Sequence, residues 1–124
     1  MERVLVVEDE VAVARSLERA LRRCGAEVLV LHDPVDAVHL ESLLHAEEPT
    51  LVLSDYLLQS SLDGVDVLSI AKRCRPTARR VLLSGSLFLV TAERREPLAP
   101  CTFLDKPWDS HALCAQLGLK GQVS

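Results

Sequence analysis

The chain alternates short runs of consecutive apolar residues with longer stretches in which apolar residues recur every three or four positions. The short runs predict strands that are buried on both faces, and the longer stretches predict helices with one apolar side. The predicted strands are residues 3–7, 27–31, 50–55, 80–84 and 102–105. The predicted helices are residues 11–24, 34–45, 64–73 and 110–117.

Residues 87–100 do not fit either pattern well. The run from 87 to 90 is compatible with a strand or a helix, and Pro97 and Pro100 limit the length of any helix that forms. We therefore expect a short, irregular fourth helix in this segment. The start of the second helix is better marked, because Asp33 is a candidate N-cap and Pro34 would occupy the first helical position.

Strands that alternate with helices along a whole chain predict a parallel sheet covered by helices on both faces. Right-handed crossovers bring the carboxyl ends of all the strands to one edge of that sheet. Ligands of such folds bind at this edge, near the point where the strand order reverses. The residues that directly follow the strands are therefore the candidates for function.

Composition limits the possible classes of protein. The 124 residues are 48% hydrophobic and 26% charged, without an internal repeat, which is typical of one globular domain spanning residues 1–124. No apolar run approaches the roughly 20 residues that span a bilayer, and the N-terminus does not resemble a signal peptide, so we expect a cytoplasmic protein. The net charge of −4 argues against direct binding to nucleic acid.

The four cysteines do not form a C-x-x-C pair, and the four histidines do not complete a zinc pattern. We expect reduced, mostly buried thiols without a redox role. The cysteines are Cys24, Cys74, Cys101 and Cys114.

Chemically useful side chains follow four of the predicted strands. Glu8 and Asp9 follow the first strand, Asp55 ends the third, Ser84 ends the fourth and Lys106 follows the fifth. Each of them alone is compatible with a turn, a cap or a solvated surface position. Together, three carboxylates would repel one another unless a cation joined them, and oxygen ligands favour Mg²⁺. The ammonium and the hydroxyl group would suit the oxygens of a transferred phosphoryl group.

Five motifs occur in an order and spacing that resemble the receiver domains of two-component response regulators, over essentially the whole chain. They are VVEDE at 6–10, LVLSDYLL at 51–58, DG at 63–64, VLLSG at 81–85 and FLDKPW at 103–108. The resemblance implies a flavodoxin-like, doubly wound α/β fold. Its five parallel strands would have the order 2-1-3-4-5, with helices on both faces.

The resemblance also implies roles for the acidic residues. Asp55 would be the phosphoacceptor, which takes a phosphoryl group from the phosphohistidine of a histidine kinase or phosphotransfer protein in a Mg²⁺-dependent step. Asp9 would bind the metal directly and Glu8 would bind it through water. Asp55 and the backbone carbonyl of Leu57 would complete the protein ligands.

The remaining site residues would sense the phosphoryl group. Ser84 and Lys106 would contact it, and Phe103 would be the aromatic switch residue that alters a partner-binding surface. Such a protein is a regulator rather than an enzyme, because it catalyses only its own phosphorylation and dephosphorylation. Its partners would be the phosphodonor and a downstream output domain or protein, with homodimerisation as a further option.

Several residues depart from the family pattern. Glu8 replaces the usual aspartate, and Ser84 stands where threonine is frequent. The loop at 58–62 lacks the usual proline and is one residue longer than usual, so we expect it to be more flexible. Leu57 is apolar, and we expect it to shield an acyl phosphate from water.

Three other functions compete with this interpretation. A phosphatase of the haloacid dehalogenase type would place its nucleophile in a D-x-D pattern after the first strand, but residues 8–10 are Glu-Asp-Glu. A flavodoxin-like FMN module would need a phosphate loop there, and three acids would repel the phosphate. A receiver-like docking scaffold that is not phosphorylated remains the main alternative.

Overall fold

The computed structural model describes residues 2–32, 36–85, 89–106 and 108–119. Its centre is a five-stranded parallel sheet with the order β2-β1-β3-β4-β5, as the resemblance to receiver domains implies. The strands are β1 (Arg3–Val7), β2 (Glu27–Leu31), β3 (Leu51–Asp55), β4 (Arg79–Ser84) and β5 (Thr102–Asp105).

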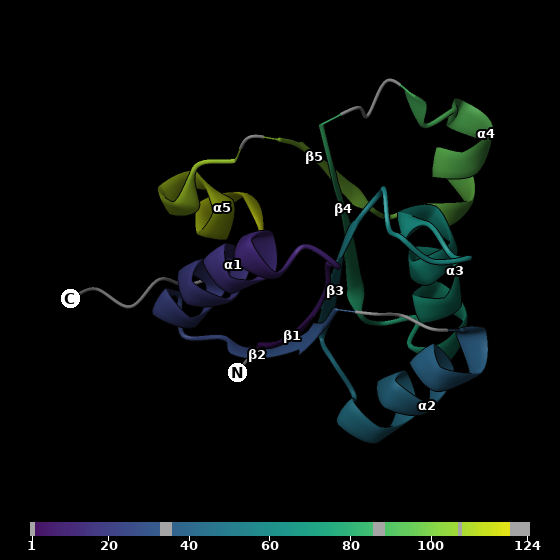
Figure 1. Ribbon diagram of the computed structural model, residues 1–124, viewed down its shortest axis with the longest axis horizontal. Helices are drawn as coiled ribbons and strands as arrows, with labels where there is room; N and C mark the ends of the chain where they lie inside the picture. Colours follow the sequence, from purple (N-terminus) through teal and green to yellow (C-terminus); the bar gives the residue numbers. More distant parts are fainter. Residues whose placement is uncertain (1, 33–35, 86–88, 107, 120–124) are drawn as a thin grey trace.

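Helices cover both faces of this sheet, with α1 and α5 on one side and α2 and α3 on the other (Figure 1). The short α4 lies on the same side as α3 (Figure 1). Within the described part of the chain, none of the helices has the length and apolar character needed to cross a membrane. The helices are α1 (Val11–Arg23), α2 (Ala37–Glu47), α3 (Gly64–Cys74), α4 (Ala92–Arg95), a 3₁₀ turn η2 (Glu96–Leu98) and α5 (Ser110–Gln116).

The sheet separates two apolar cores because successive side chains of a strand point to opposite faces. In β1, Val4 and Val6 pack with α1 and α5, whereas Leu5 and Val7 pack with α2 and α3. All four are almost completely inaccessible to solvent. Burial on both faces explains why the central strands are continuous apolar runs rather than alternating ones.

The start of α2 differs from the sequence-based expectation. The helix begins at Ala37, and the Asp36 carboxylate accepts a hydrogen bond from the His39 backbone N–H at 2.7 Å. Asp36 is therefore the N-cap, because it satisfies an N–H group that lacks a partner within the helix. The expected cap Asp33 and the expected first helical residue Pro34 lie outside the described residues.

Residues 89–100 contain the short, irregular helix that the sequence predicts. The α-helical part of this segment is the four residues of α4, which pass directly into η2. Arg94 joins α4 to the start of α3, since its guanidinium donates to both carboxylate oxygens of Asp63 at 2.7 and 3.0 Å. From within α3, Lys72 Nζ donates to the carbonyl oxygens of Pro97 and Ala99. Charged side chains thus hold a segment that is too short to be stable as a helix alone.

The expectation for two of the four cysteines was wrong. A disulfide joins Cys24, which caps the end of α1, to Cys114 in α5. Cys74 and Cys101 are free thiols, as expected. The pairing was not visible in the sequence because 90 positions separate the two residues, and only the packing of α5 beside α1 brings them together.

We predict that Gly64→Ala lowers the free energy of unfolding by about 3 kcal/mol, because the added methyl group would overlap backbone atoms that cannot easily move away. A Cβ atom at Gly64 would lie 2.2 Å from the carbonyl oxygen of Asp55 and 2.8 Å from Tyr56 Cα. Urea denaturation measures the change.

Gly85→Ala is the matched control, because its Cβ would meet only Lys106 Cβ at 3.9 Å, an ordinary contact. We expect that variant to stay within about 0.5 kcal/mol of the natural chain. Equal unfolding midpoints for the two variants would contradict this account of Gly64.

Candidate functional site

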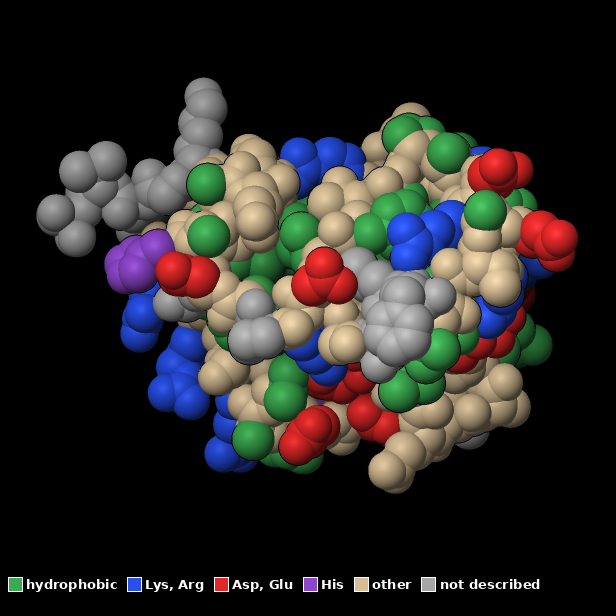
Figure 2. Space-filling view, turned by 90° about the horizontal axis from the view of Figure 1, so that it is seen from above, with side chains coloured by type: hydrophobic (Ala, Val, Ile, Leu, Met, Phe, Trp, Pro, Cys, Tyr) green, Lys and Arg blue, Asp and Glu red, His purple; other side chains and the backbone are tan. Residues whose placement is uncertain are grey.

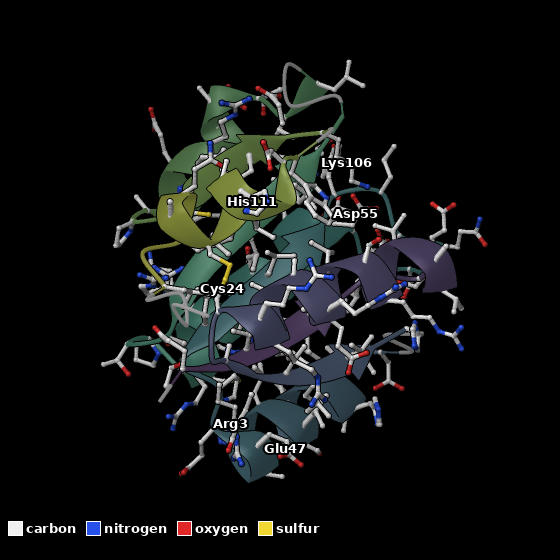
Figure 3. The ribbon with its side chains drawn as sticks, turned by 90° about the vertical axis from the view of Figure 1, so that its left-hand side faces the viewer. Arg3, Cys24, Glu47, Asp55, Lys106 and His111 are labelled. Carbon is white, nitrogen blue, oxygen red and sulfur yellow. A yellow bond between two sulfur atoms is a disulfide. The ribbon has the colours of Figure 1, made fainter. Side chains whose placement is uncertain are left out.

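The predicted site residues at the carboxyl ends of β1, β3, β4 and β5 meet at one edge of the sheet. Parallel register sets Asp55 beside Leu83, and Ser84 beside Asp105. The backbone continues this pairing past the strands, since the Lys106 N–H donates to the Ser84 carbonyl oxygen at 2.9 Å. Figure 3 shows Asp55 and Lys106 lying side by side at this edge.

Three carboxylates form a compact acidic cluster. Glu8, Asp9 and Asp55 each offer one oxygen atom, and these atoms all lie within 4.8 Å of one another. Glu8 is 1% exposed and Asp55 is 8% exposed, whereas Asp9 is half-buried. Figure 2, seen from above the view of Figure 1, shows acidic side chains near the middle of the face, with Lys or Arg and hydrophobic side chains nearby.

Lys106 supplies a positive charge to this cluster. Its Nζ atom lies 2.9 Å from Asp55 Oδ1 and 3.6 Å from Glu8 Oε1. Burial alone lowers the pKa of this ammonium group, but the hydrogen bond to Asp55 and the charges of Asp55 and Glu8 outweigh burial and raise it. Lys106 therefore stays protonated beside Asp55.

One lysine does not neutralise three carboxylates, and the remaining repulsion affects the pKa of Glu8. Burial, followed by the negative charge of Asp55, raises the pKa of the Glu8 carboxyl group from 4.5 to about 7, although Lys106 acts in the opposite direction. No described residue donates a hydrogen bond to either buried Glu8 oxygen. Buried carboxylate oxygens without donors, next to two further carboxylates, fit a small divalent cation with oxygen ligands.

The loop between β3 and α3 contacts Asp9. The backbone N–H of Gln59 donates to Asp9 Oδ2 at 2.6 Å, which fixes one carboxylate oxygen of Asp9. An open cavity of about 660 Å³ lies there. Leu57 contributes to its wall although the Leu57 side chain is 64% exposed. The cavity is lined by Asp9, Glu10, Asp55, Leu57, Leu58 and Gln59.

Ser84 and Phe103 occupy different surroundings. Ser84 is 2% exposed at the end of β4, next to the backbone of Lys106. Phe103 is half-buried in β5 and packs against the core on the α2 and α3 side, so it does not join the acidic cluster. The Arg95 guanidinium lies 5.0 Å from the centroid of the Phe103 ring, within the range of a cation–π contact.

Two contacts of this site were absent from the sequence-based interpretation. Gln59 acts through its backbone, which every residue type possesses, so its side chain gives no signal. Arg95 belongs to α4, where the sequence did not indicate which residues face β5. The residues of the acidic cluster itself were identified from the sequence because they lie at or directly after strand ends.

A protein-family model described as the response regulator receiver domain matches residues 4–118. The chain belongs to this family. It is 25% identical over 119 residues to the photosynthetic apparatus regulatory protein RegA of Cereibacter sphaeroides. The aligned region covers 96% of this chain and 62% of RegA.

Solved structures show the same fold. The chemotaxis protein CheY4 of Vibrio cholerae has a TM-score of 0.77 and 16% identity, over 95% of this receiver domain and 97% of CheY4. NtrX of Brucella abortus has a TM-score of 0.79 and 27% identity, over 94% of this receiver domain and 26% of NtrX. The chain thus spans less than two thirds of RegA and about a quarter of NtrX.

We predict that, without divalent metal, the free energy of unfolding falls by about 3 kcal/mol between pH 5 and pH 8 because of Glu8. The folded chain holds the Glu8 proton up to about pH 7, whereas the unfolded chain releases it near pH 4.5. Between these values the folded state binds more protons, so a rise in pH favours unfolding. Urea denaturation in a chelating buffer across this pH range measures the slope.

Glu8→Gln should remove this dependence and should be more stable than the natural chain at pH 8. Glu10→Gln is the control, because Glu10 is exposed and its side chain does not cap α1. Parallel pH profiles for the natural chain and Glu8→Gln would show that the buried carboxyl group is not responsible.

Proposed function

We propose that the chain is a phosphoryl-accepting domain of a two-component system, and that Asp55 accepts the phosphoryl group from the phosphohistidine of a histidine kinase or phosphotransfer protein. The contact that carries this proposal is the 2.9 Å approach of Lys106 Nζ to Asp55 Oδ1 within the acidic cluster. In the reaction an Asp55 oxygen attacks phosphorus, the P–N bond breaks, and the imidazole keeps the electron pair of that bond.

Mg²⁺ fits the acidic cluster best among common ions, because a few carboxylates with space for water suit this small, hard cation. Asp9 and Asp55 would bind it directly, Glu8 through water, and Leu57 through its backbone carbonyl. When bound, the ion would reduce the repulsion between the carboxylates and an anionic phosphodonor. The donor-free oxygens of Glu8 support this assignment.

The chain's own residues would position the phosphoryl group and balance its charge. Lys106 already lies beside Asp55 and would pair with a phosphoryl oxygen, while the Ser84 hydroxyl group would donate to another. Phosphoryl transfer depends mainly on positioning and on charge stabilisation. The chain would therefore act as a regulator that catalyses only its own phosphorylation and dephosphorylation.

Phosphorylation would be transmitted through β5. Movement of Ser84 toward the phosphoryl group would leave space for Phe103 to turn inward, and the surface of α4, β5 and α5 would change. A downstream output domain, a separate output protein or a second copy of the chain would bind this surface. We place this single receiver domain of residues 1–124 in the cytoplasm, where histidine kinases present their phosphohistidine.

The main alternative is a docking scaffold that is not phosphorylated. Such a scaffold would not require the buried acids, the paired lysine or the hydroxyl group. A haloacid dehalogenase type phosphatase would use Asp9 as the nucleophile. That role is disfavoured because one Asp9 oxygen is held by the Gln59 N–H, whereas Lys106 lies beside Asp55.

We predict that acetyl phosphate phosphorylates the natural chain only with Mg²⁺, and that Asp55→Asn abolishes this labelling. The amide removes the nucleophilic oxygen with little change in volume. Intact-mass spectrometry measures the added phosphoryl group, and beryllofluoride binding provides a second measurement.

Ser54→Ala is the control for disturbance of β3, because Ser54 precedes Asp55 and its hydroxyl group donates to the Asp55 carbonyl oxygen. Labelling of Asp9 would support the phosphatase instead. No labelling of a folded natural chain, with a phosphohistidine donor as well, would leave the docking scaffold as the function.

We also predict that Leu57→Asn shortens the lifetime of the phosphoryl group several-fold, because Leu57 lines the cavity beside Asp55 and its apolar side chain would exclude water. Loss of the added mass over time, after removal of acetyl phosphate, gives the lifetime. Leu89→Asn is the control, since Leu89 is similarly exposed but does not line this cavity. An equal or longer lifetime for Leu57→Asn would exclude this role.

A further inference from the structure

The Cys24–Cys114 disulfide lies outside the acidic cluster of Glu8, Asp9 and Asp55. It joins two helices that lie on the same face of the sheet and that both follow residues of the site, since α1 follows the Glu8–Asp9 pair and α5 follows Lys106. The Cα atoms of the two cysteines are 6.3 Å apart, within the range that a disulfide spans without backbone movement. Figure 3 shows the bond beside Cys24, between α1 and α5.

The two cysteines differ in their exposure to solvent. Cys24 is half-buried at the end of α1, whereas Cys114 is 6% exposed. Cys114 packs within the core between the sheet and the helices α1 and α5, and its Sγ atom lies 3.5 Å from the Ala20 carbonyl oxygen. A reagent from solution therefore reaches Cys24 first.

The bond also constrains a short helix. The helix α5 is only seven residues long, and a helix of this length depends on tertiary contacts. Its covalent link to α1 encloses β2, β3, β4 and β5 within one ring of chain. Breaking the bond would leave α5 held by apolar packing, by its connection to β5, and by the Arg79 guanidinium, which donates to the Leu117 carbonyl oxygen at the end of the helix.

We propose that Cys24 and Cys114 are a reversible redox modification site, whose oxidation fixes α5 against α1 and whose reduction frees α5 to open. The substrate class is a small thiol–disulfide couple, of which glutathione is the probe. In a reducing compartment, a disulfide that forms and breaks is a regulatory feature rather than a permanent staple.

The reaction is a two-step thiol–disulfide exchange that starts at Cys24, the more exposed cysteine. The Cys24 thiolate attacks the S–S bond of glutathione disulfide, forms a mixed disulfide and releases one glutathione thiolate. The Cys114 thiolate then attacks Cys24 Sγ and releases the second glutathione. Two cysteine thiols are oxidised, one glutathione disulfide is reduced, and the two released protons protonate the two glutathione thiolates.

The two free cysteines are poor competitors for this exchange. Burial raises the pKa of Cys101 to about 11, so its thiol stays protonated at neutral pH and reacts slowly with disulfides. Cys74 belongs to the end of α3, on the opposite face of the sheet from α1 and α5. Cys101 should therefore react slowly, and Cys74 should not pair with Cys24 or Cys114.

The test uses the full chain, equilibrated without oxygen in buffers of increasing ratio of glutathione disulfide to glutathione. Acid quenching, alkylation after unfolding and peptide mass spectrometry then identify the protected cysteines. We expect Cys24 and Cys114 to become protected together in excess glutathione disulfide, and to be alkylated again in excess glutathione. Hydrogen exchange of the α5 amides should be at least about tenfold slower in the oxidised chain.

Variants separate the redox site from general effects of the buffers. Cys24→Ser, which leaves the buried sulfur in place, should make exchange in α5 the same in both buffers. The double variant Cys74→Ser with Cys101→Ser should behave as the natural chain does. Asp55→Asn should oxidise normally, so a failure of this proposal is distinct from a failure of the phosphorylation proposal.

Three results would overturn the proposal. The first is alkylation of Cys24 and Cys114 even in excess glutathione disulfide. The second is a bond that persists in excess glutathione, which would make it a permanent structural disulfide. The third is a reversible bond with unchanged hydrogen exchange in α5, which would show that the link does not control the helix.

Discussion

Repulsion among three carboxylates, incompletely balanced by one lysine, is the constraint around which this molecule is organised. Glu8 and Asp55 are almost fully buried, and their oxygens lie within 4.8 Å of each other and of an Asp9 oxygen. The 2.9 Å contact between Lys106 and Asp55 offsets part of this repulsion, yet the Glu8 pKa still rises to about 7. A folded chain that keeps such a cluster is suited to a cation and to an anionic group that a cation attracts.

The parallel sheet makes this arrangement possible because it is apolar on both faces. With α1 and α5 on one side and α2 and α3 on the other, the buried carboxylates Glu8 and Asp55 lie at the strand ends. Backbone hydrogen bonds extend past those ends, as from the Tyr56 N–H to the Leu83 carbonyl oxygen, and hold the acidic loops in place. The stable core thus carries a site that is itself unfavourable for stability.

Different kinds of interaction hold the helices α4 and α5 on the two faces of the sheet. On one face, Arg94 pairs with Asp63 next to the site loop, and Arg95 lies over the Phe103 ring. On the other face, a covalent bond connects α5 with α1. Both α4 and α5 are short, so these attachments rather than intrinsic helix stability determine their positions.

The sequence by itself determined the five strands, their parallel arrangement and the cluster of Glu8, Asp9, Asp55 and Lys106, because apolar runs and strand ends are local patterns. Even the irregular shape of the segment around α4 followed from its prolines. Only the tertiary structure decided which residues α4 presents to its neighbours, that a backbone N–H holds Asp9, and that Cys24 meets Cys114. These contacts join segments far apart in the chain, and packing rather than any local pattern brings them together.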